Sequence, residues 1–233
     1  MLIERWHPVT SDMGLINAPV EEVVSGLVDW HASIGTTYRR RDVTSSLADA
    51  FEALPPLSMD RRRRLFVSTT AGWTACFQSG SAGSDPFPAM SFLAMRMGVL
   101  GMRVCSTAPG AMWPANVWEV YAPVELGGEP PLGYRRSICA ANDGGRWKFE
   151  QSGECFPFEK PEFYVLTRKR DRFTRELLAE YLGHFGLEPF SDSFYQVSPE
   201  HPAVLLEDTA RWPLRMPEFT LDEARARTLR KVG

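Results

Sequence analysis

The chain has 233 residues, of which 44% are hydrophobic and 24% are charged, and its formal net charge is -3. This composition is that of an ordinary soluble globular protein with one large domain or two small ones, and it excludes a disordered chain. Basic residues are scattered among acidic ones, so no surface-wide field favours nucleic acid or an anionic membrane as a partner.

The N-terminal stretch MLIERWHPVTSD has no apolar core of the length that a secretory signal needs, so the mature chain is expected to begin here. The longest apolar run, Pro88 to Met102, is interrupted by Arg96 and is shorter than the roughly 20 residues that span a bilayer. No transmembrane segment is therefore expected.

The four cysteines Cys76, Cys105, Cys139 and Cys155 lie far apart without a C-x-x-C pair, and three of them fall in stretches with strand character. Free cysteine behaves as a small core hydrophobe, so buried, reduced thiols are favoured over disulfides. Reduced thiols indicate a reducing compartment, and the predicted location is the cytoplasm.

Residues 17–33 predict the first long helix, between short strands at 13–16 and 36–43. Pro19 occupies a first-turn position, and Glu21 and Glu22 lie near the positive end of the helix dipole. The apolar residues that recur at helical spacing are Val20, Val23, Val24, Leu27 and Val28.

Four adjacent arginines, Arg61 to Arg64, run directly into a strand expected at 65–70. Adjacent residues on a strand or short helix point in different directions, so the four side chains cannot all grip one phosphate or RNA ligand. A solvated cluster that makes ion pairs is favoured. A second strand is expected at 73–78, after a bend at Gly72.

Residues 79–88 have the composition of a loop, and it leads into an apolar stretch at 90–97 that predicts a buried helix ended by Gly98. Asp85 in this loop is expected to cap that helix or to form an Asx turn rather than to act in catalysis. Strands are expected next at 101–107 and 117–122.

The stretch AANDGGRWKFEQSG predicts a β-hairpin, because Asn142-Asp-Gly-Gly145 lies between two runs that alternate and contains an Asp-Gly pair, with the glycines needed for positive φ. The spacing of its oxygen-bearing side chains does not fit an EF-hand loop. A phosphate loop is excluded because no Gly-Lys-Ser/Thr follows the glycines. The stretch is therefore interpreted as a turn.

Residues 171–186 space their large apolar side chains along one helical face, with Gly186 as the stop. A short edge strand is expected at 203–207. Thr220 and Glu223 have the spacing of a capping box, which predicts a final helix through Lys231 that docks weakly or contacts a partner. The order of elements predicts a single α+β domain at 1–216, with helices packed against a mainly antiparallel sheet, and a helical tail at 217–233.

The sequence contains no G-x-S-x-G elbow, Walker loop or Rossmann fingerprint. The four histidines stand alone, without carboxylates or cysteines at metal-ligand spacing, so neither a metal nor a cofactor is expected.

The stretch GLINAPVEEVVSGLVDW, residues 14–30, resembles the strand-to-helix start of START-like lipid-binding domains, in which an Ala-Pro pair leads into a helix. The resemblance implies a binder of a lipid or another small apolar ligand. The helix expected at 90–97 interrupts the run of strands that this family has.

Three functions remain open. The favoured one is a non-enzymatic module that binds another protein, such as a bacterial immunity protein that neutralises a toxin, because the chain combines 7 tryptophans with many arginines and has no recognisable catalytic set. A START-like binder would have a cavity between the sheet and the helix at 171–186, lined by Met90, Met95, Trp118 and Phe149. An enzyme would bring Asp85, Arg135, Asp143 and Arg146 to one cleft. The candidate binding residues are Asp85, Phe87, Arg135, Asn142, Asp143 and Arg146.

Overall fold

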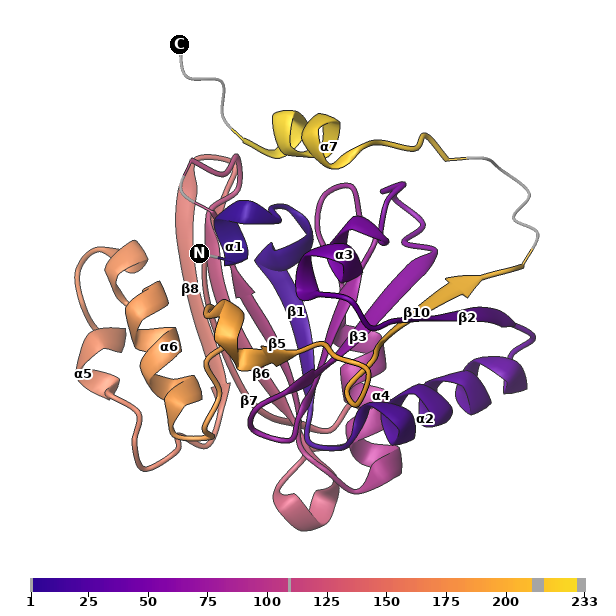
Figure 1. The fold of residues 1–233 in the computed structure, drawn as a ribbon. Coiled ribbons are helices and arrows are strands. Elements are labelled where there is room, and N and C mark those ends of the chain that lie inside the picture. Colours follow the sequence, from indigo (N-terminus) through magenta and orange to yellow (C-terminus); the bar gives the residue numbers. More distant parts are fainter. Residues whose placement is uncertain (1, 109, 211–215, 230–233) are drawn as a thin grey trace.

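The computed structural model describes residues 2–108, 110–210 and 216–229. Within these ranges the chain forms one compact domain, in which helices pack on both faces of a single antiparallel sheet (Figure 1). The α+β class with a mainly antiparallel sheet is therefore confirmed.

The strands, in chain order, are β1 (Asp12–Ile16), β2 (Tyr38–Val43), β3 (Arg63–Thr69), β4 (Thr74–Gln78), β5 (Gly101–Ser106), β6 (Ala115–Tyr121), β7 (Tyr134–Asp143), β8 (Arg146–Gly153), β9 (Tyr195–Gln196) and β10 (Ala203–Asp208). The α-helices are α1 (Leu2–Arg5), α2 (Val20–Ser33), α3 (Leu47–Glu52), α4 (Phe87–Met97), α5 (Pro161–Tyr164), α6 (Arg175–Gly183) and α7 (Leu221–Thr228). Short 3-10 helices are η1 (Val9–Ser11), η2 (Val124–Leu126), η3 (Lys169–Asp171) and η4 (Asp192–Phe194).

The strands follow the order β2-β10-β3-β4-β1-β5-β6-β7-β8, and β9 pairs with β3. The expectation of an edge strand at 203–207 is wrong, since β10 lies between β2 and β3. Its Ala203 to Leu206 run is apolar at every position because both faces of the strand are covered. The edge is instead β2, whose central residues Arg39 to Asp42 are exposed and charged, as is typical of edge strands.

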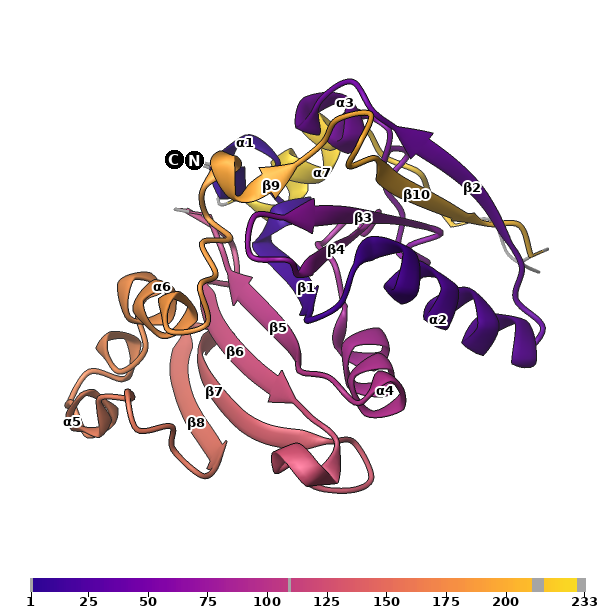
Figure 2. The same ribbon diagram turned by 60° about the horizontal axis from the view of Figure 1, so that its bottom comes forward.

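Side chains alternate between two hydrophobic cores, one on each face of the sheet. On β1, Met13 and Leu15 contact the core that includes α3, α6 and α7, whereas Ile16 contacts the core formed with α2 and α4. Figure 2 shows α2 and α4 together on one side of the sheet and α6 on the other. Helix α4 comes so close to β5 that a Cβ atom at Gly101 would lie 2.9 Å from the carbonyl oxygen of Met90.

The lengths of several helices differ from the sequence expectations. Helix α4 begins three residues earlier than expected, at Phe87, and ends as predicted at Gly98, which has a φ of 71°. Helix α6 begins at Arg175, because Thr174 accepts a hydrogen bond from the Leu177 N–H and so caps it. The short helices α3 and α5 have too few apolar repeats to be recognised from the sequence.

The β7–β8 hairpin is confirmed. Its two-residue turn consists of Gly144 and Gly145, whose φ angles are 64° and 92°. Positive φ at both central residues is the geometry of a type I′ turn, which explains the need for glycine. The side-chain oxygen of Asn142 also accepts a hydrogen bond from the Gly145 N–H, over 3.0 Å.

The C-terminal helix α7 begins with the predicted capping box of Thr220 and Glu223 and ends at Thr228. The expected continuation to Lys231 lies partly outside the described residues. The helix is held to the N-terminal segment, since the His7 imidazole bonds to the Thr228 hydroxyl over 2.8 Å and Arg225 donates to the Arg5 carbonyl.

The four cysteines are free. Cys76 and Cys105 are buried, as predicted, but Cys139 is partly exposed and Cys155 is exposed. Burial fails for these two because Cys139 lies on β7 next to the edge strand β8, and Cys155 lies in the loop that follows β8. Among the described residues, no helix is long and apolar enough to cross a membrane.

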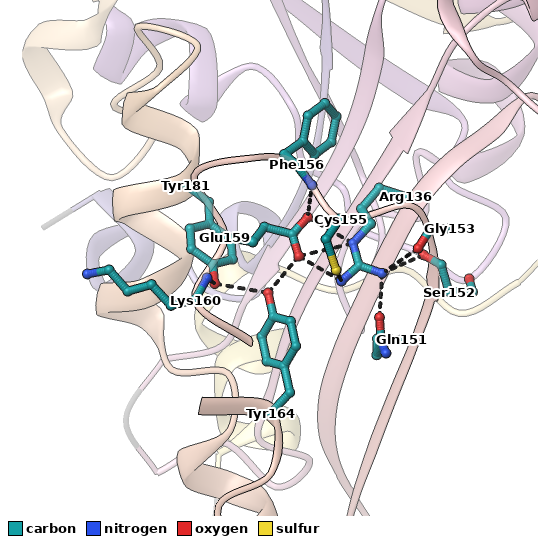
Figure 3. A network of polar contacts seen from close by, with 10 residues as sticks. All are labelled: Arg136, Gln151, Ser152, Gly153, Cys155, Phe156, Glu159, Lys160, Tyr164 and Tyr181. Atoms are coloured by element: carbon teal, nitrogen blue, oxygen red, sulfur yellow. Dashed lines mark hydrogen bonds and ion pairs between the residues drawn. The ribbon is translucent and has the colours of Figure 1, made fainter. Parts of the chain in front are cut away.

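A buried polar network joins β7 to the loop that precedes α5 (Figure 3). The guanidinium of Arg136 donates to both carboxylate oxygens of Glu159, which also accepts from the Tyr164 hydroxyl and the Phe156 N–H. Nη1 also donates to the Gln151 side chain and to carbonyl oxygens at the end of β8, and Nη2 donates to the Cys155 sulfur. The network has its donors and acceptors paired, so we interpret it as a structural connection.

Candidate functional site

The hairpin residues proposed as binding groups lie at the edge of the sheet. Asp143 pairs in register with Arg146 and makes an exposed ion pair with Lys148, over 2.8 Å. Asn142 uses its side chain to close the turn. These residues are held in place by local contacts, and they border none of the other candidates.

The remaining candidates occupy three separate places. Phe87, at the start of α4, packs 5.8 Å from the rings of both Tyr121 and Tyr134. The Arg135 guanidinium lies 4.7 Å from the ring of Phe156. Asp85 lies in the loop after β4 and makes no side-chain cap to α4, whose N-cap residue is Pro86, so the predicted cap, one of the two roles expected for it, is wrong.

The proposed enzyme cleft does not form from these residues. Arg135 and Asp143 lie at opposite ends of β7, eight residues and roughly 26 Å apart. Strands β1, β5 and β6 lie between β7 and β4, which leads into the Asp85 loop. Asp85, Arg135, Asp143 and Arg146 therefore cannot meet around one small substrate.

The residues expected to line an apolar cavity are also separated. Met90 belongs to the core under α2 and α4, whereas Trp118 belongs to the core on the opposite face. Trp118 has no exposed surface, and its ring lies 5.7 Å from that of Tyr181 on α6 and 5.6 Å from that of Phe156. Aromatic side chains thus fill the space between α6 and the sheet.

Asp85 does line a pocket of about 310 Å³, which we term the α2/α4 pocket. Its walls come from the end of α2, the start of α4 and the polypeptide around the start of β3 and the end of β4. The lining residues are Trp30, His31, Ile34, Asp60, Arg61, Arg64, Gln78, Asp85, Pro88 and Ala89.

The arginine run divides between this pocket and its surroundings. Arg61 and Arg64 line the pocket, whereas Arg62 donates to the carbonyls of Asp208 and Ala210 and Arg63 pairs with Glu207. The prediction that the four side chains diverge is confirmed. They are half-buried rather than solvated, because β3 continues the run into the centre of the sheet.

Arg61 has a φ of 48°, and it is the only residue other than glycine with positive φ among those the structure describes. Left-handed backbone geometry is unfavourable for a side chain of this size and is found preferentially at functional positions. The Arg61 Nε donates to the carbonyl of Gly83 over 3.3 Å, so the guanidinium is directed toward the loop that carries Asp85.

A chain of hydrogen bonds runs along one wall of the pocket. Arg64 Nη1 donates to the Tyr38 hydroxyl over 2.5 Å, and that hydroxyl lies 2.7 Å from His31 Nδ1. Because a guanidinium can only donate, the Tyr38 hydroxyl is the acceptor in its bond with Arg64, and it shares a second hydrogen bond with His31 Nδ1.

Local electrostatics keep His31 and Tyr38, the two titratable groups of this hydrogen-bonded series, in one protonation state near neutral pH. Burial, and secondarily the charge of Arg64, lower the pKa of His31 to about 4. Burial raises the pKa of Tyr38 to about 12. Both groups are therefore neutral at pH 7.

The pocket has an aromatic and aliphatic rim. The Trp30 indole stacks on the ring of Phe92, with centroids 3.9 Å apart, and is only partly buried. Ile34 is 64% exposed, and Met59, next to the pocket residue Asp60, is 54% exposed. Large apolar side chains thus remain in solvent beside two arginines.

Trp30, His31 and Tyr38 were not identified from the sequence. His31 continues the helical spacing of Val24 and Leu27, so it is a polar residue on a packed helix face. That position was the one available signal. Its link to Arg64 through Tyr38 depends on the pairing of β2 with β10, which the sequence did not predict.

A second polar cluster faces the same side of the sheet. Arg103 donates to Asp12 over 2.6 Å and lies 3.4 Å from Glu119, which accepts from the Tyr121 hydroxyl. Burial raises the pKa of Asp12 to about 6, although Arg103 acts in the opposite direction. Among the described residues, no group of three or more His, Cys, Asp or Glu side chains could hold a metal ion.

No family model, no curated protein and no solved structure matches this chain. The α2/α4 pocket is the place where a sequence candidate, Asp85, meets a strained arginine and exposed apolar side chains. This pocket and its rim are therefore the candidate functional site.

Proposed function

We propose that this protein is a protein-binding module and that its contact surface is the α2/α4 pocket with its apolar rim. The observation that supports the proposal is Ile34, which lines the pocket and is 64% exposed beside Trp30 and Arg61. Tryptophan and arginine are enriched among the residues that dominate binding energy at protein interfaces. Exposed apolar groups with a polar surround are typical of such surfaces.

An immunity-type role is the specific form of this proposal, in which the bound protein is a toxin. The same surface would then contact the toxin, and Arg61 and Arg64 would supply the charged contacts. A cytoplasmic location belongs to the same proposal, and the free, buried thiols of Cys76 and Cys105 support it.

The test is affinity capture from a lysate of the source organism with the wild type and two variants. Each variant replaces one exposed apolar residue by glutamate. Ile34→Glu places a charge on the pocket rim, and Val165→Glu places the same charge at a position near α5 that is 78% exposed. We expect one stoichiometric partner to be retained by the wild type and by Val165→Glu and to be lost with Ile34→Glu. A partner retained equally by both variants would place the interface elsewhere, and the absence of any stoichiometric partner would overturn the proposal.

Identification of the captured protein tests the immunity-type form. A toxin whose activity is blocked by the wild type and not by Ile34→Glu would support it. A captured partner without toxic activity would rule this form out and leave the binding proposal in place.

A further inference from the structure

We propose that the α2/α4 pocket binds a carboxylate group. This inference rests on the proposed function for one point alone, the naming of a partner protein as one of two sources of the carboxylate. The chemistry of the pocket is argued from its own donors, charges and shape.

Both arginines of the pocket keep unused hydrogen-bond donors. Arg64 donates through Nη1 to Tyr38, and its Nη2 has no acceptor in the described structure. Arg61 bonds through Nε to Gly83, and its Nη1 is 4.0 Å from the Asp85 carboxylate, which is beyond hydrogen-bond distance. An acceptor that enters the pocket can therefore bond to the free Nη groups of these two side chains.

Two further polar groups line the same space. His31 lines the pocket, and its Nδ1 is bonded to the Tyr38 hydroxyl, so its Nε2 is the ring nitrogen left without a partner within the described residues. Helix α4 has no side-chain cap, and within the described residues the N–H groups of Phe87 and Ala89 have no acceptor. The positive end of the helix dipole thus lies at the pocket wall formed by Pro88 and Ala89.

The two aspartates of the pocket limit the charge of the ligand. The Asp60 carboxylate accepts a hydrogen bond from the Ser58 hydroxyl, and the Asp85 side chain is 46% exposed. With Arg61 and Arg64 these groups sum to zero formal charge, so a monoanion meets less repulsion than a phosphate dianion. The planar guanidinium fork also matches a carboxylate in two-point geometry.

The size and the rim favour a carboxylate attached to an apolar group. A volume of about 310 Å³ is at the low end for a ligand pocket, large enough for one side chain or a small aromatic acid. Trp30 and Ile34 provide the apolar contact beside the donors. The carboxylate can come from an acidic residue of a partner protein or from a free small acid.

The chemistry is tested by ¹H–¹⁵N NMR titration of the full chain with phenylacetate, and with phenylacetamide as its uncharged counterpart. We expect saturable shifts at the Ala89 amide and the Trp30 indole with phenylacetate, and an affinity for phenylacetamide that is lower by roughly tenfold, as for the loss of a charge-assisted hydrogen bond. Equal binding of the two probes, or shifts confined to other residues, would overturn the inference.

Matched arginine variants show whether the pocket guanidinium groups are responsible. Arg61→Gln is expected to weaken phenylacetate binding by roughly tenfold. Arg41→Gln removes an exposed arginine on β2 that does not line the pocket, and it should leave binding unchanged. Loss of binding in both variants, or in neither, would contradict the assignment. Unchanged amide spectra outside the pocket establish that the variants are folded.

The source of the carboxylate is settled by combining the probe with partner capture. Displacement of the captured partner by phenylacetate assigns the pocket to an acidic residue of that partner, whereas phenylacetate binding without displacement assigns it to a free small acid. If the partner is captured through Ile34 but phenylacetate does not bind, the protein-binding proposal stands and the carboxylate inference fails. If phenylacetate binds and no partner is captured, the carboxylate inference stands and the protein-binding proposal fails.

Discussion

Arg136 and Glu159 form an ion pair with no exposed side-chain surface, in which Nη2 and Oε2 are 2.7 Å apart. The pair joins β7 to the loop that leads into α5, so it connects elements that share no strand pairing (Figure 3). Removal of one partner leaves the other charge buried without compensation, which typically costs 3–5 kcal/mol.

We therefore expect Arg136→Met to lower the free energy of unfolding by about 3–5 kcal/mol, as measured by urea denaturation at pH 7. The double variant Arg136→Met/Glu159→Met removes both charges and should recover part of that loss. A double variant that is less stable than Arg136→Met alone would show that the hydrogen bonds from Tyr164 and Phe156 to Glu159 matter more than the charge pair.

The imidazole of His7 predicts acid sensitivity at the junction of the two chain ends. Burial, and secondarily the charge of Arg225, lower the pKa of His7 from 6.5 to about 4. The unfolded chain takes up a proton below pH 6.5 and the folded chain does not, so this contribution to stability is full above pH 6.5 and declines as the pH falls toward 4. The expected loss between pH 7.5 and pH 5 is on the order of 1–2 kcal/mol.

Replacement of the histidine isolates this effect from other titrating groups. His7→Gln retains a polar side chain near Ser11 and Thr228 but does not titrate. The difference in stability between pH 7.5 and pH 5 should therefore be smaller in His7→Gln than in the wild type. An identical pH dependence in the two proteins would show that His7 does not contribute.

Asp85 and Arg146 are both candidate binding residues, and the structure places them apart, in the loop after β4 and on the β7–β8 hairpin. Asp85→Asn removes a negative charge from the α2/α4 pocket, so phenylacetate affinity should rise by about two- to fivefold, the range for a half-exposed charge pair. Arg146→Gln at the hairpin should leave this affinity unchanged. Weaker phenylacetate binding by Asp85→Asn would mean that Asp85 serves mainly to position Arg61.

The close contact of α4 with β5 predicts that Gly101 does not tolerate a side chain. The Cβ atom of an alanine would lie 2.9 Å from the backbone oxygen of Met90 and 3.0 Å from the Ala94 Cβ, so the helix has to shift. Gly101→Ala should destabilise the fold by about 1–3 kcal/mol in urea denaturation. Gly183→Ala, at an exposed position with open space around it, is the matched control and should not destabilise the fold.

Local patterns in the sequence predicted the elements that local physics determines. The helical spacing of Val20 to Leu27, the Gly144-Gly145 turn and the capping box of Thr220 each specify an element through residues within a few positions of one another. Each of these is confirmed. Strand order could not be predicted in this way, because it depends on which segments far apart in the sequence lie side by side.

The candidate site was only partly predictable for the same reason. Asp85 was identified from its loop, but its neighbours in the pocket come from α2 and from the start of β3. The link from His31 through Tyr38 to Arg64 requires β2 and β3 to lie on either side of β10. Nothing in the spacing of these residues encodes that arrangement.

The insertion of β10 between β2 and β3 also affects the order in which the protein assembles during synthesis. Within the described residues, β2 pairs only with β10, so residues 38–43 have no strand partner until residues 203–208 have left the ribosome. Tyr38, which connects His31 to Arg64, lies on β2, so it is not fixed in the sheet until β10 has been made. The α2/α4 pocket therefore acquires this arrangement only after β10 has been made, and a nascent chain that stops before β10 does not carry it.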